Sequence, residues 1–434
     1  MSENGKILDA TYARRKIKKS LAKRHFQETR FKFYGLSAVT LAIFFLCFLF
    51  YLILSNGIPG LFQHYVTLSV NLDQSRLDPK GDLSDQSLFL GEASELIRES
   101  LYKTLGVVDG RKEKKIARSI ISSASDTRLI NFIKENRDLV GKTASIRFAL
   151  DDDVDTFLRG YILRETPEKE RRLSNLAIQY IDALNSKELI SYELSDYLFS
   201  GSASREAEIA GIKGALVGSV LAMLVCLCIA FPLGIMTAIY LEEIAPKNWV
   251  TELIEININN LAAVPSVVFG IMGLAIFIVA FGLPRSIPLV GGVVLALMTL
   301  PTIIISSRAA IKAVPPSIRE AAYGIGASKM QMIFHHVLPL AMPGMLTGTI
   351  IGMAQALGET APLLMIGMVA FIVDIPGGVF EPSTALPVQI FMWADFAERM
   401  FVHKTSAAIM VLLGFLLLMN FSAVILRKKL EKRW

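Results

Sequence analysis

The feature that most constrains this chain is a set of long apolar runs, each able to cross a lipid bilayer as an α-helix. About 20 apolar residues in a helix span the roughly 30 Å of hydrocarbon in a membrane. A helix also satisfies its own backbone hydrogen bonds, which lipid cannot do. The predicted spans are residues 33–54, 212–240, 257–281, 287–310, 341–368 and 406–426. The sequence therefore predicts an α-helical polytopic membrane protein with six transmembrane helices.

Charges beside these runs predict how the chain is oriented. Residues 1–32 and 427–434 form two basic tails. Lysine and arginine mark the cytoplasmic side, so an even number of spans places both termini in the cytoplasm and makes the chain a multi-pass protein of a cytoplasmic (inner) membrane. Residues 33–54 are too long, and their basic flank is too extended, for a cleaved signal peptide, so we expect a retained first span. The turn that carries Glu242 and Glu243 lacks the positive excess found elsewhere.

Other features limit the classes of function. The net charge of +6 does not indicate a nucleic-acid partner, because the basic residues gather beside the apolar runs, where membrane lipid is the expected neighbour. The three cysteines all lie within apolar runs and offer neither a disulfide framework nor a cysteine-rich metal site. No phosphate-binding loop of the type G-x-x-x-x-G-K-S/T occurs. We therefore expect no ATP hydrolysis by this chain and no bound cofactor or metal.

Between the first two spans, residues 55–210 have the balanced charge of a soluble domain. Apolar residues alternate in two stretches and follow a helical period in three others. The predicted strands are 66–72 and 146–150, and the predicted helices are 96–105, 116–124 and 173–184. We expect a small α+β domain on the periplasmic side. The aspartates at 151–155 lack the glycine and distal glutamate of a calcium loop, so a solvated turn is the expected structure there.

A short polar helix is predicted in the loop 311–340, between the fourth and fifth spans. Ser317 and Glu320 have the spacing of a capping box, in which the hydroxyl and the carboxylate bind the free amides at a helix start. Two prolines precede Ser317, and Gly326 suits a left-handed stop, so a helix of about two turns is expected. Helical spacing places four small or apolar residues on one shallow face that fits a groove on a partner: Ile318, Ala321, Ala322 and Ile325.

This loop carries a family resemblance. Glu320-Ala321-Ala322, then Gly326, then Leu338-Pro339 resemble the E-A-A-x-x-x-G-x(9)-I-x-L-P loop of permease subunits of bacterial ATP-binding-cassette importers, with His336 in place of the isoleucine. Downstream, the segment Gly358-Glu359-Thr360-Ala361-Pro362-Leu363-Leu364 resembles phosphate-importer permeases of the PstA type. The resemblance covers residues 261–426.

The resemblance implies a fold, a function and partners. It implies the type I importer permease fold, here in residues 211–426, with the α+β domain inserted between helices 1 and 2. The loop would be the coupling helix that docks on the ATPase through Ser317, Glu320, Ala321, Ala322 and Gly326. The implied partners are a second homologous permease subunit, a dimeric cytoplasmic ATPase and a periplasmic phosphate-binding protein, with inorganic phosphate as the transported ion. The chain would then be a transport subunit and not an enzyme.

Polar groups at membrane depth are the candidates for the translocation path, since ionisable residues there are costly and usually functional. Glu359 and Thr360 lie in the fifth span, and Glu359 either faces the path or a subunit interface, or binds a neighbouring helix. Gln355 stands where many relatives in the resembled family have an arginine. Arg308, near the inner end of the fourth span, either faces the path or reaches the lipid headgroups.

Small residues and prolines shape the predicted spans. Gly344, Gly348 and Gly352 recur every fourth residue, which lets another helix approach closely, within this chain or in a partner permease. Pro265, Pro301 and Pro362 are expected to interrupt or kink three spans.

Three other functions are compatible with parts of this pattern. The same machine could carry another oxyanion, such as molybdate or sulfate. A membrane receptor could use residues 55–210 as its sensor, although no output domain follows the last span. An intramembrane enzyme would need a catalytic constellation that the sequence does not show. We expect the outer domain to contact the binding protein or the partner permease.

Overall fold

The computed structural model describes residues 10–78, 87–88, 91–107, 110–369 and 371–430. Its described residues fall into two compact units, Met1–Ser55 and Asn56–Trp434. The first unit consists of most of helix α1 (Ala10–Gly60), whose last residues belong to the second unit. The apolar part of α1 is long enough to cross a membrane and contains the predicted first span. It is apolar all round, as a helix surrounded by lipid is expected to be.

The second unit begins with an antiparallel sheet, in which β1 lies between β2 and β3. The strands are β1 (Phe62–Asn71), β2 (Thr143–Ala149) and β3 (Ile190–Leu194). Both predicted strands form, with Leu68 opposite Ile146 in the register. The third strand was not predicted because it is short and none of its residues is fully buried, which leaves little alternation to detect.

Helices cover this sheet and complete its core. They are α2 (Gln74–Leu77), α4 (Ala93–Leu105), α5 (Arg111–Arg118), α6 (Ser125–Glu135), α7 (Asp152–Leu158), α8 (Asn175–Ser186) and α9 (Asp196–Ser200), with the short 3-10 turns η1 (Arg137–Leu139), η2 (Glu168–Glu170) and η3 (Ala207–Ile209). The alternating residues of β1 and the apolar faces of α4 and α8 meet in one hydrophobic core. The predicted α+β character is therefore present in the described residues.

One predicted helix of this region, residues 116–124, is helical only at its first three residues. The expected helix 116–124 ends at Arg118, and Ile121 instead forms a backbone bridge with Leu150 at the end of β2. Ile120 and Ile121 are buried all the same. Their apolar spacing reflects burial in the core, which an extended segment achieves here as well as a helix would.

The aspartates at 151–155 do not form a solvated turn. They form the first turn of α7, where Oδ1 of Asp151 accepts a hydrogen bond from the N–H two residues on, at 3.1 Å. Asp155 is fully buried, with Arg159 Nε at 2.5 Å and His64 Nδ1 at 2.7 Å from its two oxygens. Burial alone would raise the pKa of Asp155, but His64 and Arg159 outweigh it, and that pKa lies below its usual value. The prediction failed because both partners of Asp155, His64 and Arg159, come from outside the aspartate run.

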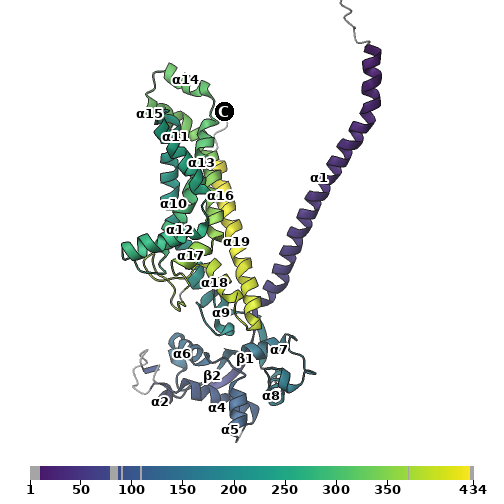
Figure 1. The fold of residues 1–434 in the computed structure, drawn as a ribbon. Helices are drawn as coiled ribbons and strands as arrows, with labels where there is room; N and C mark the ends of the chain where they lie inside the picture. The colour runs from purple at the N-terminus through teal and green to yellow at the C-terminus, as the bar shows by residue number, and fades with distance from the viewer. Residues whose placement is uncertain (1–9, 79–86, 89–90, 108–109, 370, 431–434) are drawn as a thin grey trace, which may run out of the picture. The chain divides into compact units, whose positions relative to one another are not determined.

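The remaining helices form the membrane part of the unit. In chain order they are α10 (Lys213–Ile239), η4 (Tyr240–Ile244), α11 (Trp249–Ala262), α12 (Ser266–Gly273), η5 (Leu274–Ala280), α13 (Pro288–Lys312), α14 (Pro316–Gly324), α15 (Lys329–Gln331), η6 (Met332–Val337), α16 (Leu338–Gly358), α17 (Ala361–Met365), α18 (Leu386–Ala394) and α19 (Arg399–Leu430). The segments η4, η5 and η6 are π-helical. Figure 1 shows α10, α13, α16 and α19 running alongside one another, with α14 and α15 at one end of this bundle.

Two of the six predicted spans are not continuous helices. Among the described residues, five helices are long and apolar enough to cross a membrane, and a sixth span exists only if α11 and α12–η5 are counted together across a 100° bend. Pro265 lies at that bend, which breaks the predicted span 257–281. In the predicted span 341–368 the helix stops at Gly358, because the next residue takes an extended backbone conformation. Pro301, by contrast, lies within the continuous α13.

Candidate functional site

The predicted coupling helix is present as α14, but its start differs from the prediction. The helix begins at Pro316, with Pro315 at the capping position and no side-chain cap. An N–H at the first helical position has no partner within the helix. Proline is favoured there because it lacks this N–H. Ser317 therefore lies inside the helix, and the capping box predicted for Ser317 and Glu320 is wrong. A capping box does form at the start of α15, between Ser328 and Gln331.

Arg319 fixes α14 to the ends of two membrane helices. Its Nη1 donates to the carbonyl of Val314 at 2.6 Å, and its Nη2 donates to the carbonyl of Ile311 at 3.0 Å. The same Nη2 lies 2.7 Å from Oε1 of Glu243, whose side chain is only 8% exposed. Helix ends leave carbonyls without partners, and a cation there also interacts favourably with the helix dipole. The guanidinium thus joins α14 to the end of α13 and to η4, which continues α10.

An apolar contact reinforces this connection. Ala322 is buried in a hydrophobic cluster that contains Ile239 of α10, Ile311 of α13, Ile333 of η6 and Met345 of α16. The side chain is small, so the α14 backbone can lie close to the bundle. A displacement of α14 must therefore displace the ends of several membrane helices or break this packing.

The opposite side of α14 is open. Ser317, Glu320 and Ala321 are exposed, and so is Ile325, at 78%. The predicted single face of four small residues is therefore divided: Ile318 and Ala322 face the bundle, whereas Ala321 and Ile325 do not. Such an exposed helix, with small and apolar side chains beside one carboxylate, suits docking into a groove of another protein.

Gly326 ends this segment as predicted. Its φ is +83°, a left-handed conformation that favours glycine. Its N–H donates to the carbonyl of Tyr323 at 2.9 Å, which closes the last turn.

Arg308 is paired within the chain. Its guanidinium contacts Oε1 of Glu242 at 2.9 Å and Oε1 of Glu255 at 2.7 Å, which ties α13 to η4 and α11. Sequence reasoning missed both this network and the pairing of Arg319 with Glu243. The available signal was the acidic turn that carries Glu242 and Glu243, since its acids match the two arginines at the same end of the bundle.

Glu359 occupies the break between α16 and α17. It follows the last helical residue of α16 with an extended backbone, and its side chain is half-buried, as is that of Thr360. Within the described part of the chain, the Glu359 carboxylate has no hydrogen-bond or ion-pair partner. Gln355, one turn earlier, is exposed. The break thus presents a carboxylate and an amide that no described residue of this chain binds.

The stripe of glycines on α16 faces α13 of the same chain. A Cβ added at Gly344 would lie 2.6 Å from Cβ of Ala310, and one at Gly348 would overlap the side chain of Ser306. Gly352 has more room, with the nearest atoms at 3.6 Å or more. The close approach of α13 and α16 thus depends on Gly344 and Gly348.

Comparisons with known proteins place this geometry in a family. Residues 230–434 match the family described as binding-protein-dependent transport system inner membrane component. Residues 18–168 match a domain of unknown function, DUF3333. The solved structure of the MetNI methionine transporter in an inward-facing conformation aligns with 51% of this chain and 94% of its own, at 17% identity and a TM-score of 0.39.

Characterised relatives resemble the membrane part of the chain. The phosphate transport system permease protein PstA of Yersinia pestis is 35% identical over 224 residues, which cover 50% of this chain and 73% of the relative. PstC of Haemophilus influenzae is 30% identical over 239 residues, which also cover 50% of this chain and 73% of the relative. The probable ABC transporter permease protein YqgH of Bacillus subtilis is 38% identical over 162 residues, 36% of this chain and 52% of the relative. With its helical bundle and its exposed α14, this chain belongs to the family of inner-membrane permease components of binding-protein-dependent transport systems.

Proposed function

We propose that this chain is a permease subunit of an ATP-driven importer of inorganic phosphate. The observation that carries the proposal is its similarity to PstA of Yersinia pestis, at 35% identity over 73% of that relative. PstC of Haemophilus influenzae, also named for phosphate transport, matches the same share of its own length at 30% identity. Molybdate and sulfate remain outcomes of the test and are not favoured by these relatives.

The proposed machine has four kinds of component. This chain pairs with a second, similar permease, because two ATPase subunits need two docking helices. A dimeric cytoplasmic ATPase binds at α14, and a periplasmic binding protein delivers phosphate on the other side. This requires that α14 and both termini lie in the cytoplasm and that the sheet lies in the periplasm. The basic residues that end α19 support this orientation.

The coupling step follows from the contacts of α14. The ATPase binds the exposed side of α14, which carries Ser317, Glu320 and Ala321, and closure of the ATPase moves this helix. Arg319 and Ala322, on the other side, transmit that movement to α10 and α13 through the hydrogen bonds and packing described above. The pairs of Arg308 with Glu242 and Glu255 keep α11 and α13 together as they move.

Phosphate crossing requires donors and acceptors that the protein does not already use. The Glu359 carboxylate accepts a hydrogen bond from the P–O–H group of hydrogen phosphate, or binds an arginine of the partner permease, and the proposal includes both uses. Thr360 and Gln355 supply neutral hydrogen-bonding groups on either side of it. Arg308 is assigned to the ion-pair network and not to the ion path, because two carboxylates already bind it.

Uptake of labelled phosphate tests the function. Cells that lack this chain are complemented with the wild type, Glu320→Ala or the control Glu252→Ala, which changes an exposed glutamate of α11, and protein levels are matched. Wild type and Glu252→Ala should restore uptake at micromolar phosphate that excess sulfate or molybdate does not inhibit, whereas Glu320→Ala should restore less. If the wild type restores no phosphate uptake, the substrate assignment is wrong, and the same cells report on the other oxyanions.

A second measurement tests the role of residues 55–210. We propose that this domain contacts the binding protein or the partner permease, since shorter members of the resembled family lack such an insertion. Deleting it should weaken the binding of the binding protein to the assembled complex. Unchanged affinity and unchanged uptake in a well-expressed deletion variant would show that the domain has another role.

A further inference from the structure

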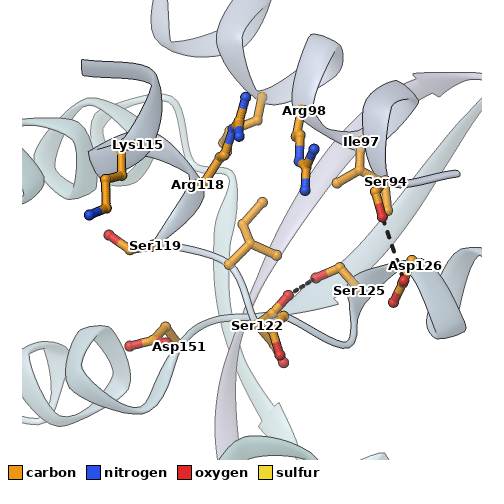
Figure 2. A pocket seen from close by; sticks show the side chains of 13 residues that line it. Ser94, Ile97, Arg98, Lys115, Arg118, Ser119, Ser122, Ser125, Asp126 and Asp151 are labelled. Carbon is orange, nitrogen blue, oxygen red and sulfur yellow. Dashed lines mark hydrogen bonds between the residues drawn. The ribbon is translucent and has the colours of Figure 1, made fainter. Parts of the chain in front are cut away.

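A cavity of about 360 Å³ lies in the α+β region of the chain. Its walls are α4, α5 and the segment that joins α5 to α6, and all its lining residues fall between Ser94 and Asp151 (Figure 2). Cavities of roughly 300–1,000 Å³ are the usual size of small-molecule sites. None of the transport residues described above contributes to it, so its chemistry needs a separate explanation.

The central group of this cavity is Arg98. It extends from α4 toward the segment that carries Ser122 and Ser125 (Figure 2). The side chain is half-buried, yet within the described part of the chain its guanidinium has no hydrogen-bond or ion-pair partner. Such groups are normally paired when buried, and arginine carries five N–H donors in a planar fork that matches phosphate and carboxylate. Its donors are therefore available to a ligand.

The floor opposite Arg98 is held rigidly by backbone pairing with the sheet. The N–H of Ser122 donates to the carbonyl of Ala149 at 3.0 Å, and the N–H of Asp151 donates to the carbonyl of Ile120 at 3.0 Å. Ser125 Oγ donates to the carbonyl of Ser122 at 2.5 Å. Hydroxyl groups thus line the floor at positions that the fold sets before any ligand binds.

The lining of the cavity carries more cations than carboxylates. Lys115 and Arg118 add two cations to Arg98, against Asp126 and Asp151. Arg118 also bonds the Tyr102 hydroxyl, and the carboxylate of Glu206, outside the lining, accepts from Ser123. Asp126 already accepts the N–H of Thr127 at 2.8 Å. Burial raises the pKa of Asp151 to about 7, so this carboxyl carries less than a full charge at neutral pH. Helix α6 also begins here without a side-chain cap, which adds the partial positive charge of a helix start.

The rest of the wall is apolar. Ile97 and Leu101 lie one turn apart on the same face of α4 as Arg98, and Ile121 faces them from the floor. A bare tetrahedral anion would leave these side chains without a contact. We propose that this cavity binds a small organic anion, with its phosphate or carboxylate group on Arg98 and its carbon skeleton against the three apolar side chains.

Binding to the purified full-length chain in lipid nanodiscs tests this proposal, and it is independent of transport. Glycerol 3-phosphate, glycerate, inorganic phosphate and neutral glycerol are titrated by calorimetry. Glycerol 3-phosphate or glycerate should bind more tightly than inorganic phosphate, and glycerol should not bind. Arg98→Gln should weaken that binding at least tenfold.

The control is Arg137→Gln, which makes the same change on an exposed arginine of η1, outside the cavity. It should leave binding unchanged, and both variants should melt at the wild-type temperature, since Arg98 has no described partner to lose. The proposal is overturned if neither organic anion binds, if inorganic phosphate binds as tightly as they do, or if Arg98→Gln and Arg137→Gln bind alike.

Discussion

At the scale of single residues, two arginines at the ends of membrane helices make different contacts. Arg308 pairs with two carboxylates, whereas Arg319 divides its donors between Glu243 and two backbone carbonyls. The guanidinium spreads five N–H donors over a planar fork, whereas the three donors of a lysine ammonium share one nitrogen, so lysine is a poor substitute. Both side chains lie where membrane helices end, and neither could be assigned from its own sequence neighbourhood.

Replacing Arg319 separates its structural and coupling roles. Arg319→Ala leaves the nearly buried Glu243 without a cation, which should destabilise the chain by about 3–5 kcal/mol. The double variant Arg319→Ala, Glu243→Gln should regain much of that stability but not transport, because the link from α14 to α13 is still missing. Thermal unfolding in detergent and phosphate uptake measure the two effects. If uptake recovers together with stability, Arg319 has no coupling role.

Glu359 should behave in the opposite way. No described residue binds its carboxylate, so Glu359→Gln should leave the unfolding temperature within about 2 °C of the wild type. Uptake should nevertheless fall at least tenfold, because an amide cannot replace the charge and acceptor capacity of the carboxylate. Glu252→Gln, on the exposed face of α11, is the matched control. A fall in unfolding temperature that parallels the loss of uptake would instead indicate a structural hydrogen bond.

At the scale of elements, the contact between α13 and α16 depends on glycine. Gly348→Ala places a methyl group against Ser306 and should cost about 1–3 kcal/mol of stability. Gly358, at the end of the same helix, has no atom within 4 Å of an added Cβ. Gly358→Ala should be neutral or slightly stabilising. Thermal unfolding of the two variants makes the comparison, and a Gly348→Ala variant as stable as Gly358→Ala would show that the contact with Ser306 does not require glycine.

The sequence was most informative where one physical signal dominates an element. Long apolar runs located most spans, and alternation located β1 and β2, since Val66 and Leu68 are buried as the pattern requires. Prediction from the sequence failed where contacts in the folded chain determine the local backbone conformation. Glu359 lies within an apolar run, yet the backbone there is extended. Ser317 has a capping-box spacing, yet the preceding proline takes the first helical position.

The candidate site was likewise predictable from the sequence only in part. Spacing and resemblance located α14 and its stop at Gly326, whose backbone conformation follows from its residue type. The carboxylates that bind Arg308 and Arg319 lie more than 50 residues away in the sequence, in α11 and in an acidic turn that orientation rules only marked as an exception. The cavity around Arg98 likewise joins α4, α5 and the end of β2, which no local pattern connects.

At the scale of the whole molecule, buried carboxyls make stability depend on pH. Burial, with the nearby charges of Glu208, Asp153 and Asp152, raises the pKa of Asp151 to about 7, and burial raises that of Asp152 to about 6. At these two positions the folded chain therefore holds more protons than the unfolded chain between about pH 4 and 7. Their contribution to stability falls as pH rises through that range.

Asp151→Asn tests this dependence. Asparagine keeps the cap at the start of α7 but removes the charge. The variant should be more stable than the wild type at pH 8, by up to about 4 kcal/mol, and should differ little at pH 4. Asp126→Asn is the control, because this carboxyl accepts hydrogen bonds from Thr127 and Ser94 and lies outside the aspartate run that begins α7. A wild type that is equally stable at pH 5 and pH 8 would contradict the expectation.

The exposed side of α14 also bears on how such a protein is made. Ile325 is 78% exposed and Tyr323 is 48% exposed, beside a helix that is otherwise firmly attached to the bundle. A newly inserted copy shows this apolar patch to water until a partner covers it, and exposed patches of this kind attract chaperones and proteases. Under the proposed function, docking would serve biogenesis as well as transport: an orphan subunit would be recognisable as unfinished, and its lifetime in the cell should lengthen when the ATPase is co-produced.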